Sequence, residues 1–240
     1  APLTPEDYQR VFLEGWGNVP VASSLPLMMI MTAVFLGTLS ACLEISGERP
    51  IYLRERAVNL RIPVYVASKL PALFLFSALQ SFVYVGLTVL LLGIDPARVS
   101  IPVLVLTFLL VSAVSSLIGL FLSSVDPSAG GNSVVLAVVV VLPQLIYSGG
   151  LAPDFYGGMS TLAKAFAAVF PARWGYEMLL TAFYQYPDWA HQLVERPPGE
   201  GGMGFHFGTD VYLRNAGYLA LLAAAYFTVT CLSLRRYDRL

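Results

Sequence analysis

Few side chains in this 240-residue sequence are of the types that carry out chemistry. The candidates for acid–base or metal-binding chemistry in one polar stretch are Asp154, Glu177, Asp188, His191, His206 and Asp210. Their spacing is not that of a metal site. The sequence contains no GxxxxGK[ST] phosphate loop, so this chain does not bind ATP by that device. We therefore predict no catalytic, cofactor-binding or metal-binding residues in this chain.

The densest group of charges lies between positions 44 and 61, which hold four arginines and three glutamates. Glu48 and Arg49 precede Pro50, a combination typical of a helix start. We expect a helix over about 48–60, on which Ile51, Arg54 and Glu55 follow helical spacing. Because charged and apolar positions intermix, this helix is suited to docking on a surface that is both polar and apolar. On the residues alone, it could equally be a positively charged membrane anchor without a partner.

The chain as a whole is strongly apolar. Hydrophobic residues make up 57% and charged residues 12%, and the mean hydropathy is +0.70. An ordinary soluble domain has about 45–50% apolar and about 25% charged residues. The net charge of −1 does not indicate nucleic-acid binding. Cys42 and Cys231 lie near the ends of apolar runs and are expected to pack there, not to form a disulfide or zinc site.

The apolar segments predict an all-α polytopic membrane protein with about five spanning helices. The expected spans are 21–43, 62–94, 101–122, 133–147 and 216–234. Residues 1–20 form a polar outer segment, and 21–240 a single transmembrane domain. The second span is longer than a bilayer core, so its first turns should stand in water and Lys69 should reach the interface.

The stretch 149–215 is expected to form an outer helical loop. Its apolar pieces, 159–170 and 174–186, are each too short to cross a bilayer, which indicates re-entrant or interfacial helices. An aromatic set suited to the headgroup region is Tyr156, Trp174, Tyr176, Tyr184, Tyr186 and Trp189.

Arginine placement predicts the orientation. The 49–61 cluster and Arg235–Arg236 fall on one side of the alternating spans, close to their ends. Short cytoplasmic loops are enriched in Lys and Arg, so this side and the C-terminus are expected in the cytoplasm. The expected location is a plasma membrane, most simply a bacterial inner membrane.

The 48–61 segment resembles the coupling helix of ABC exporters of the G (White, pleiotropic-drug) subfamily and their bacterial single-chain relatives. In that family a Glu-Arg-x-x-Tyr-x-Arg-Glu-Arg run is followed by Tyr-x-x-x-Lys-Leu in the next span. The matching residues here are Glu48, Arg49, Tyr52, Arg54, Glu55, Arg56, Tyr65, Lys69 and Leu70. The resemblance implies that the first six of these couple the chain to an ATPase.

A second motif of the same family lies at the other end of the chain. Ser148-Gly149 is followed by Pro171-Ala172-Arg173-Trp174-Gly175, similar to the family's Ser-Gly and Pro-x-Arg-Tyr/Trp-Gly pair. The resemblance covers roughly 25–240. It implies a gate at Ser148, Gly149, Gly150 and Leu151. The family often has Leu-Leu after Ser-Gly, whereas this chain has Gly150-Leu151 and so only one of the two leucines.

The resemblance also implies function. The chain would be the permease domain of an ATP-driven exporter that moves an amphipathic or lipidic substrate by alternating access. A nucleotide-binding domain, upstream or on another chain, would hold ATP and Mg. A second transmembrane half, most simply an identical one, would complete the path. The implied path residues are Phe35, Leu36, Val140, Pro143, Leu145 and Ile146. The family has six spans, so the five here match its second to sixth and the first is expected upstream.

Two other classes stay open on the residues alone. A membrane-embedded transferase would need clustered acids or histidines at one interface, and the outer loop offers acids without metal-type spacing. An ion-coupled carrier or channel would need ionisable residues within the spans and an internal inverted repeat. No Asp, Glu or His lies in the middle of a predicted span.

Overall fold

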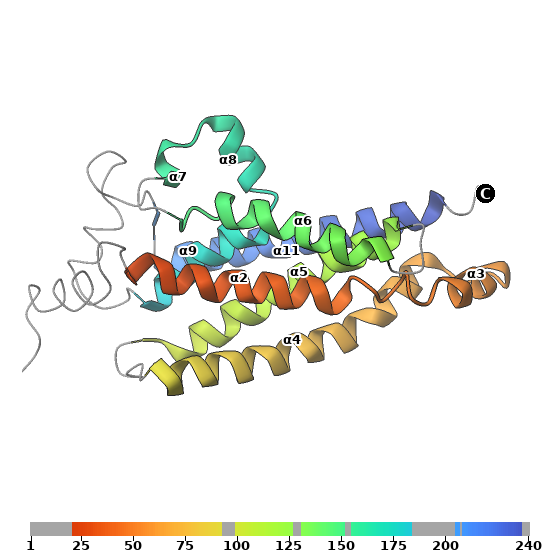
Figure 1. The fold of residues 1–240 in the computed structure, drawn as a ribbon, viewed down its shortest axis with the longest axis horizontal. Helices are drawn as coiled ribbons and strands as arrows, with labels where there is room; N and C mark the ends of the chain where they lie inside the picture. Colours follow the sequence, from red (N-terminus) through yellow and green to blue (C-terminus); the bar gives the residue numbers. More distant parts are fainter. Residues whose placement is uncertain are drawn as a thin grey trace, which may run out of the picture.

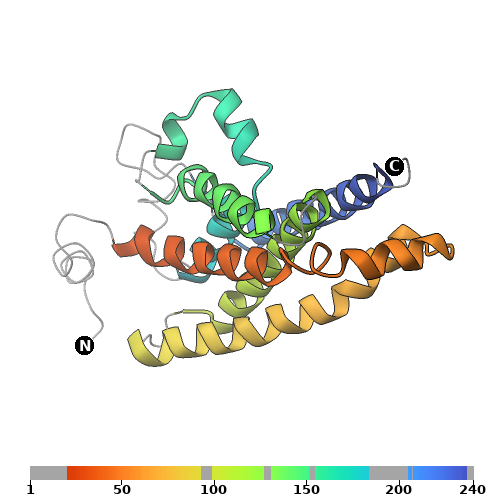
Figure 2. The same ribbon diagram turned by 45° about the vertical axis from the view of Figure 1, so that its right-hand side comes forward.

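The computed structural model describes residues 21–92, 99–126, 131–151, 155–183, 205–206 and 208–236. Within these ranges the chain is helical, without strands. Five longer helices lie side by side and alternate in direction along the bundle (Figures 1 and 2). They are α2 (Val21–Ala41), α4 (Ile62–Leu92), α5 (Ile101–Val125), α6 (Gly131–Tyr147) and α11 (Thr209–Arg235). The shorter helices are α3 (Arg49–Ala57), α7 (Phe155–Gly158), α8 (Thr161–Ala167) and α9 (Pro171–Phe183).

The chain is a multi-pass membrane protein by the length and composition of its helices. Helices α4, α5 and α11 are long and apolar enough to cross a membrane. Helices α2 and α6 contain the shorter apolar stretches Leu25–Ala41 and Asn132–Tyr147. The predicted all-α membrane fold is confirmed.

Several helix bounds differ from those predicted. Helix α3 ends at Ala57 instead of about residue 60, and α5 continues to Val125 instead of 122. Helix α11 begins at Thr209, well before the predicted 216, because the polar residues Asp210, Arg214 and Asn215 form its first turns. The predicted outer segment 1–20 lies outside the described residues.

Helix α5 is the centre of the bundle. Its contact with α2 is the most extensive one between any two described helices. Two glycines allow this approach. A Cβ at Gly37 of α2 would overlap the carbonyl oxygen of Ser112, and a Cβ at Gly119 of α5 would overlap that of Thr38. Small residues at such contacts are typical of membrane helices, which associate through close packing and not through the hydrophobic effect.

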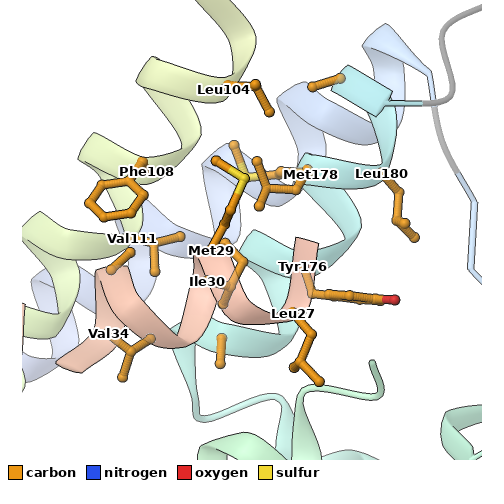
Figure 3. Packing of buried hydrophobic residues seen from close by; sticks show 14 of the residues in the cluster. Leu27, Met29, Ile30, Val34, Leu104, Phe108, Val111, Tyr176, Met178 and Leu180 are labelled. Atoms are coloured by element: carbon orange, nitrogen blue, oxygen red, sulfur yellow. The ribbon is translucent and has the colours of Figure 1, made fainter. Parts of the chain in front are cut away.

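Helix α9 is inserted into the bundle. It packs against α2, α5 and α11, and its residues Ala172, Tyr176 and Met178–Leu180 are fully buried. Figure 3 shows Tyr176, Met178 and Leu180 beside Leu27, Met29 and Ile30 of α2, and Leu104, Phe108 and Val111 of α5. The prediction of a re-entrant element agrees with this position.

The assignment of Tyr176 to a headgroup belt was wrong, because its ring is 0% exposed and packs edge-on against Phe205, beside Gly150. Tyr156 and Trp174 are half-buried. Tyr184, Tyr186 and Trp189 lie outside the described residues.

The glycine contact between α2 and α5 leads to a prediction. Gly37→Ala should lower the unfolding free energy by about 1–3 kcal/mol, the usual cost of overpacking, because the added methyl meets main chain that cannot rotate away. The midpoint of thermal unfolding in detergent micelles measures this change. Gly86→Ala in α4 is the matched control, since a Cβ there meets nothing within 4 Å and alanine favours a helix. Equal midpoints for the two variants would contradict the close contact.

Candidate functional site

Helix α3 lies at one end of the bundle, the end at which α11 finishes (Figures 1 and 2). Pro50 occupies its first turn, where a missing N–H costs nothing. The helix ends at Ala57, and two residues later Asn59 adopts a left-handed backbone conformation with φ 76°. The Arg56 guanidinium donates to the carbonyl of Leu60 and so holds the turn from α3 into α4.

Tyr52 anchors α3 on its inner side. Its side chain is buried, and its ring lies 4.9 Å from the ring of Tyr65 in α4. Both tyrosines belong to an apolar cluster with Ala41, Ile45, Ile62 and Leu234. The first turns of α4 therefore pack against α3 and the end of α11.

Lys69 connects α4 to the turn between α2 and α3. Its Nζ lies 3.3 Å from Oε2 of Glu44 and 2.5 Å from Oε2 of Glu48. Lys69 thus reaches the polar turn at this end of the bundle, and its place at the interface stays a prediction. An ammonium one to two turns inside an apolar helix favours nearby carboxylates over bare lipid.

A buried polar network ties the same turn to α5 and α6. Ser123 Oγ accepts from the backbone N–H groups of Ile45 at 3.0 Å and Ser46 at 2.8 Å. Asp126 Oδ2 accepts from Ser133 N at 2.8 Å and from Ser133 Oγ at 2.7 Å. Asp126 thus caps α6, as expected of a residue before a helix.

Arg49 joins this network from α3. Its Nη1 donates to the carbonyl oxygen of Asp126 at 2.7 Å. A small pocket beside this contact is lined by Ile45, Ser46, Arg49, Tyr52, Leu53, Ser123, Ser124, Asp126 and Leu234. The base of α3 is therefore held by α4, α5 and α6 together.

The opposite face of α3 is open. Ile51 and Val58 are 47% and 80% exposed, and the exposed charged side chains of Arg54 and Glu55 share their side by helical spacing. Leu53 is 46% exposed but lines the pocket beside Arg49. The six predicted coupling residues thus divide into two groups. Glu48, Arg49, Tyr52 and Arg56 hold the helix in place, whereas Arg54 and Glu55 point outward.

The six predicted path residues lie on two neighbouring helices, α2 and α6. Phe35 and Ile146 are exposed, whereas Leu36 and Leu145 pack partly against the main core. Val140 packs against the cluster around Cys42 and Ile118, and Pro143 is half-buried.

The four predicted gate residues form the turn after α6. Ser148 Oγ donates to the carbonyl of Leu145 at 2.9 Å and accepts from Gly150 N at 3.3 Å. Gly149 has φ 86°, which favours glycine. Ser148, Gly149 and Gly150 are buried, and Leu151 is exposed.

Within the described residues, no group of three or more His, Cys, Asp or Glu side chains could hold a metal ion. The charged side chains at the α3 end are instead engaged in holding helices together, through Lys69 and Arg49. This arrangement is suited to passing force between helices.

Comparison with known proteins agrees with this geometry. Residues 8–184 match the ABC-2 type transporter family. Because the match covers more than half of the sequence, the chain belongs to this family. It is a membrane domain of the ABC transporter permease type and acts as a transport subunit; the resemblance to the G subfamily fits this assignment.

A similar curated protein is the ABC transporter ATP-binding/permease protein Rv1747 of Mycobacterium tuberculosis (strain ATCC 25618 / H37Rv). It is 30% identical over 179 residues, which cover 72% of this chain and 20% of the relative. The chain thus corresponds to about a fifth of that protein's length.

The sequence reasoning missed the serine network at the base of α3. Ser46, Ser123 and Ser133 are spaced far apart in the chain and each sits beside an apolar run, so a one-dimensional pattern does not bring them together. The ion pairs of Lys69 with Glu44 and Glu48 were also missed. The available signal was a lysine inside a long apolar run.

The two adjacent serines at the end of α5 give a prediction. Ser123→Ala removes the acceptor for two buried N–H groups, each of which costs about 1–3 kcal/mol when left unpaired. Thermal unfolding in micelles should show a clear loss of stability. Ser124→Ala is the control, since that hydroxyl is equally buried but donates only to Phe121 of its own helix. Equal losses for both variants would show that the inter-helix network contributes nothing.

Proposed function

We propose that this chain is the permease domain of an ATP-driven exporter and that α3 receives the movement of an ABC ATP-binding domain. The observation that supports this most directly is the division of α3 into a fixed inner face and an open outer face. The outer face offers the apolar side chains Ile51 and Val58 together with the opposite charges Arg54 and Glu55. A surface of this mixed kind is suited to a protein partner.

The contacts at the base of α3 supply a mechanical route. Arg49 ties the helix to the end of α5, Lys69 ties its leading turn to α4, and Tyr52 packs on Tyr65. A displacement of α3 by a partner would therefore move the ends of α4 and α5 together. Rigid-body movement of this type is one of the common ways in which domains switch between two states.

The substrate path would run along α2 and α6. Both helices expose large apolar side chains at Met28, Phe35, Leu142 and Ile146. A second copy of the chain facing this surface would enclose a path lined by apolar groups. Such a path fits an amphipathic or lipidic substrate better than an ion, which needs polar or charged lining groups.

The orientation follows from the same end of the bundle. The arginines of α3 and Arg235–Arg236 at the end of α11 lie together at the α3 end (Figure 1). This end would face the cytoplasm, where ATP-binding domains work, and the α7–α8 end would face outward. The membrane would be a bacterial inner membrane.

Cross-linking in the intact transporter tests the docking surface. A benzophenone amino acid at Val58 should cross-link to the ATP-binding domain upon illumination, with the linked peptides identified by mass spectrometry. Leu91 in α4 is the control position, since it is 77% exposed and lies near the opposite end of that helix. Cross-links to an ATP-binding domain from Leu91 but not from Val58 would refute the proposal.

Charge reversal tests whether the open face transmits force. Arg54→Glu combined with Glu55→Lys should lower the ATP hydrolysis rate of the full-length protein by about tenfold, the effect of ~1.4 kcal/mol. Folding should be little affected, because both side chains are exposed. Arg61→Glu, another exposed arginine beyond the end of α3, is the control. Unchanged hydrolysis in the double variant would exclude a coupling role for these two residues.

A further inference from the structure

A buried ion pair lies at the end of the bundle opposite to α3. Arg173 and Glu177, one turn apart on α9, are 6% and 2% exposed. Arg173 Nη1 lies 3.1 Å from Glu177 Oε2. Charges buried this deeply are retained only when paired and hydrogen-bonded, and breaking such a pair is strongly destabilising. The pair is not accounted for by coupling to an ATPase or by an apolar path.

Glu177 connects α9 to two other parts of the chain. Its Oε2 accepts from Asn215 Nδ2 in α11 at 2.8 Å, and its Oε1 accepts from the backbone N–H of His206 at 3.2 Å. Asn215 is itself fully buried. The carboxylate therefore joins α9 to the start of α11 and to the residues just before it.

Arg173 lies in a cage of aromatic rings. Its guanidinium carbon is 4.1 Å from the ring centroid of Tyr156, 4.7 Å from that of Phe205 and 5.3 Å from that of Trp174. The rings of Tyr156 and Phe205 are themselves stacked, with centroids 5.0 Å apart. A cation held over aromatic faces fixes the position of those rings as well as its own.

The same rings fill the space beside the turn at Ser148–Gly150. A Cβ at Gly149 would meet Phe205 at 2.6 Å and Tyr156 at 2.8 Å. A Cβ at Gly150 would overlap the ring of Tyr176, which packs edge-on against Phe205 at 5.2 Å. Contacts thus run without a gap from the glycine turn through the rings to Arg173, Glu177 and Asn215.

We propose that Arg173 and Glu177 are positioning residues that hold the turn at Ser148–Gly150 closed through the rings of Tyr156 and Phe205. The ion pair fixes the positions of the Tyr156 and Phe205 rings. These rings leave no room for a side chain at Gly149. The idea that the substrate leaves the protein at this turn rests on the proposed export function. The positioning of the turn by Arg173 and Glu177 does not depend on that function.

The test measures how accessible the turn is. In the full-length protein, with Cys42→Ser and Cys231→Ala as background, Ser148→Cys places a thiol at a position that is 0% exposed. A membrane-impermeant maleimide is added to membranes opened by sonication, so that both faces are reached. Leu151→Cys, at an exposed position, serves as the fully reactive reference. Labelling requires neither ATP nor transport, so its outcome is independent of whether α3 couples to an ATPase.

The decisive variant is Arg173→Met combined with Glu177→Gln, which removes both charges, keeps the volume and leaves an amide oxygen as acceptor for the buried Asn215 amide, so no unpaired charge is left to unfold the protein. Its thermal midpoint should stay near that of the parent, while the Ser148→Cys thiol should react faster by on the order of tenfold. Lys164→Met is the matched control, because it removes another cation near the Tyr156 ring, at 5.5 Å, without touching Glu177. The control should leave labelling unchanged.

Protection of the Ser148→Cys thiol in the double variant equal to that in the parent would overturn the proposal, because packing alone would then close the turn. Arg173→Lys gives a second measurement if the double variant does not accumulate. It keeps the charge but loses the planar group that stacks on the rings, so the thiol should again react faster. Parent-like protection with lysine would equally count against the proposal.

Discussion

The close contact between α2 and α5 is the constraint on which the rest of the structure depends. At Gly37 and Gly119 the two main chains approach so closely that a methyl group would not fit. Their registers are therefore fixed against each other. At one end this places Ser123 beneath the N–H groups of the turn that leads into α3. At the other it leaves Met29 and Ile30 facing α9. One contact near the middle of the bundle sets the geometry at both ends.

The two ends hold their polar groups for different reasons. At the α3 end, Lys69, Arg49 and Asp126 link the tips of several helices, so that the open surface of α3 rests on a firm base. At the far end, Arg173 and Glu177 are enclosed by rings and by Asn215. Between them the described helices meet mainly through apolar and small hydroxyl side chains. The charged side chains that link described helices thus lie toward the two ends of the bundle.

The sequence predicted the long helices and the position of α3 because both depend on local signals, namely runs of apolar residues and a proline preceded by charges. It also predicted a re-entrant element around α9. It did not predict that Tyr176 would lie in the core or that Glu177 would form a buried link to α11. An aromatic residue next to an acid occurs both at membrane interfaces and inside helical bundles, so the sequence pattern does not distinguish the two positions. Nor did it separate Arg54 and Glu55 from Arg56, because the turn at Asn59 that redirects Arg56 is a three-dimensional feature.

The position of α9 has a consequence for the order of membrane assembly. Helices α2 and α5 are synthesised before α9, yet their shared apolar face is covered by it. Helix α9 carries two charges and is too short to cross a bilayer alone, so insertion as an independent segment is unfavourable. Its acid is satisfied in part by Asn215, which is made later still. Glu177 therefore gains its Asn215 partner only after α11 has been made, so the polar contacts of α9 are completed last.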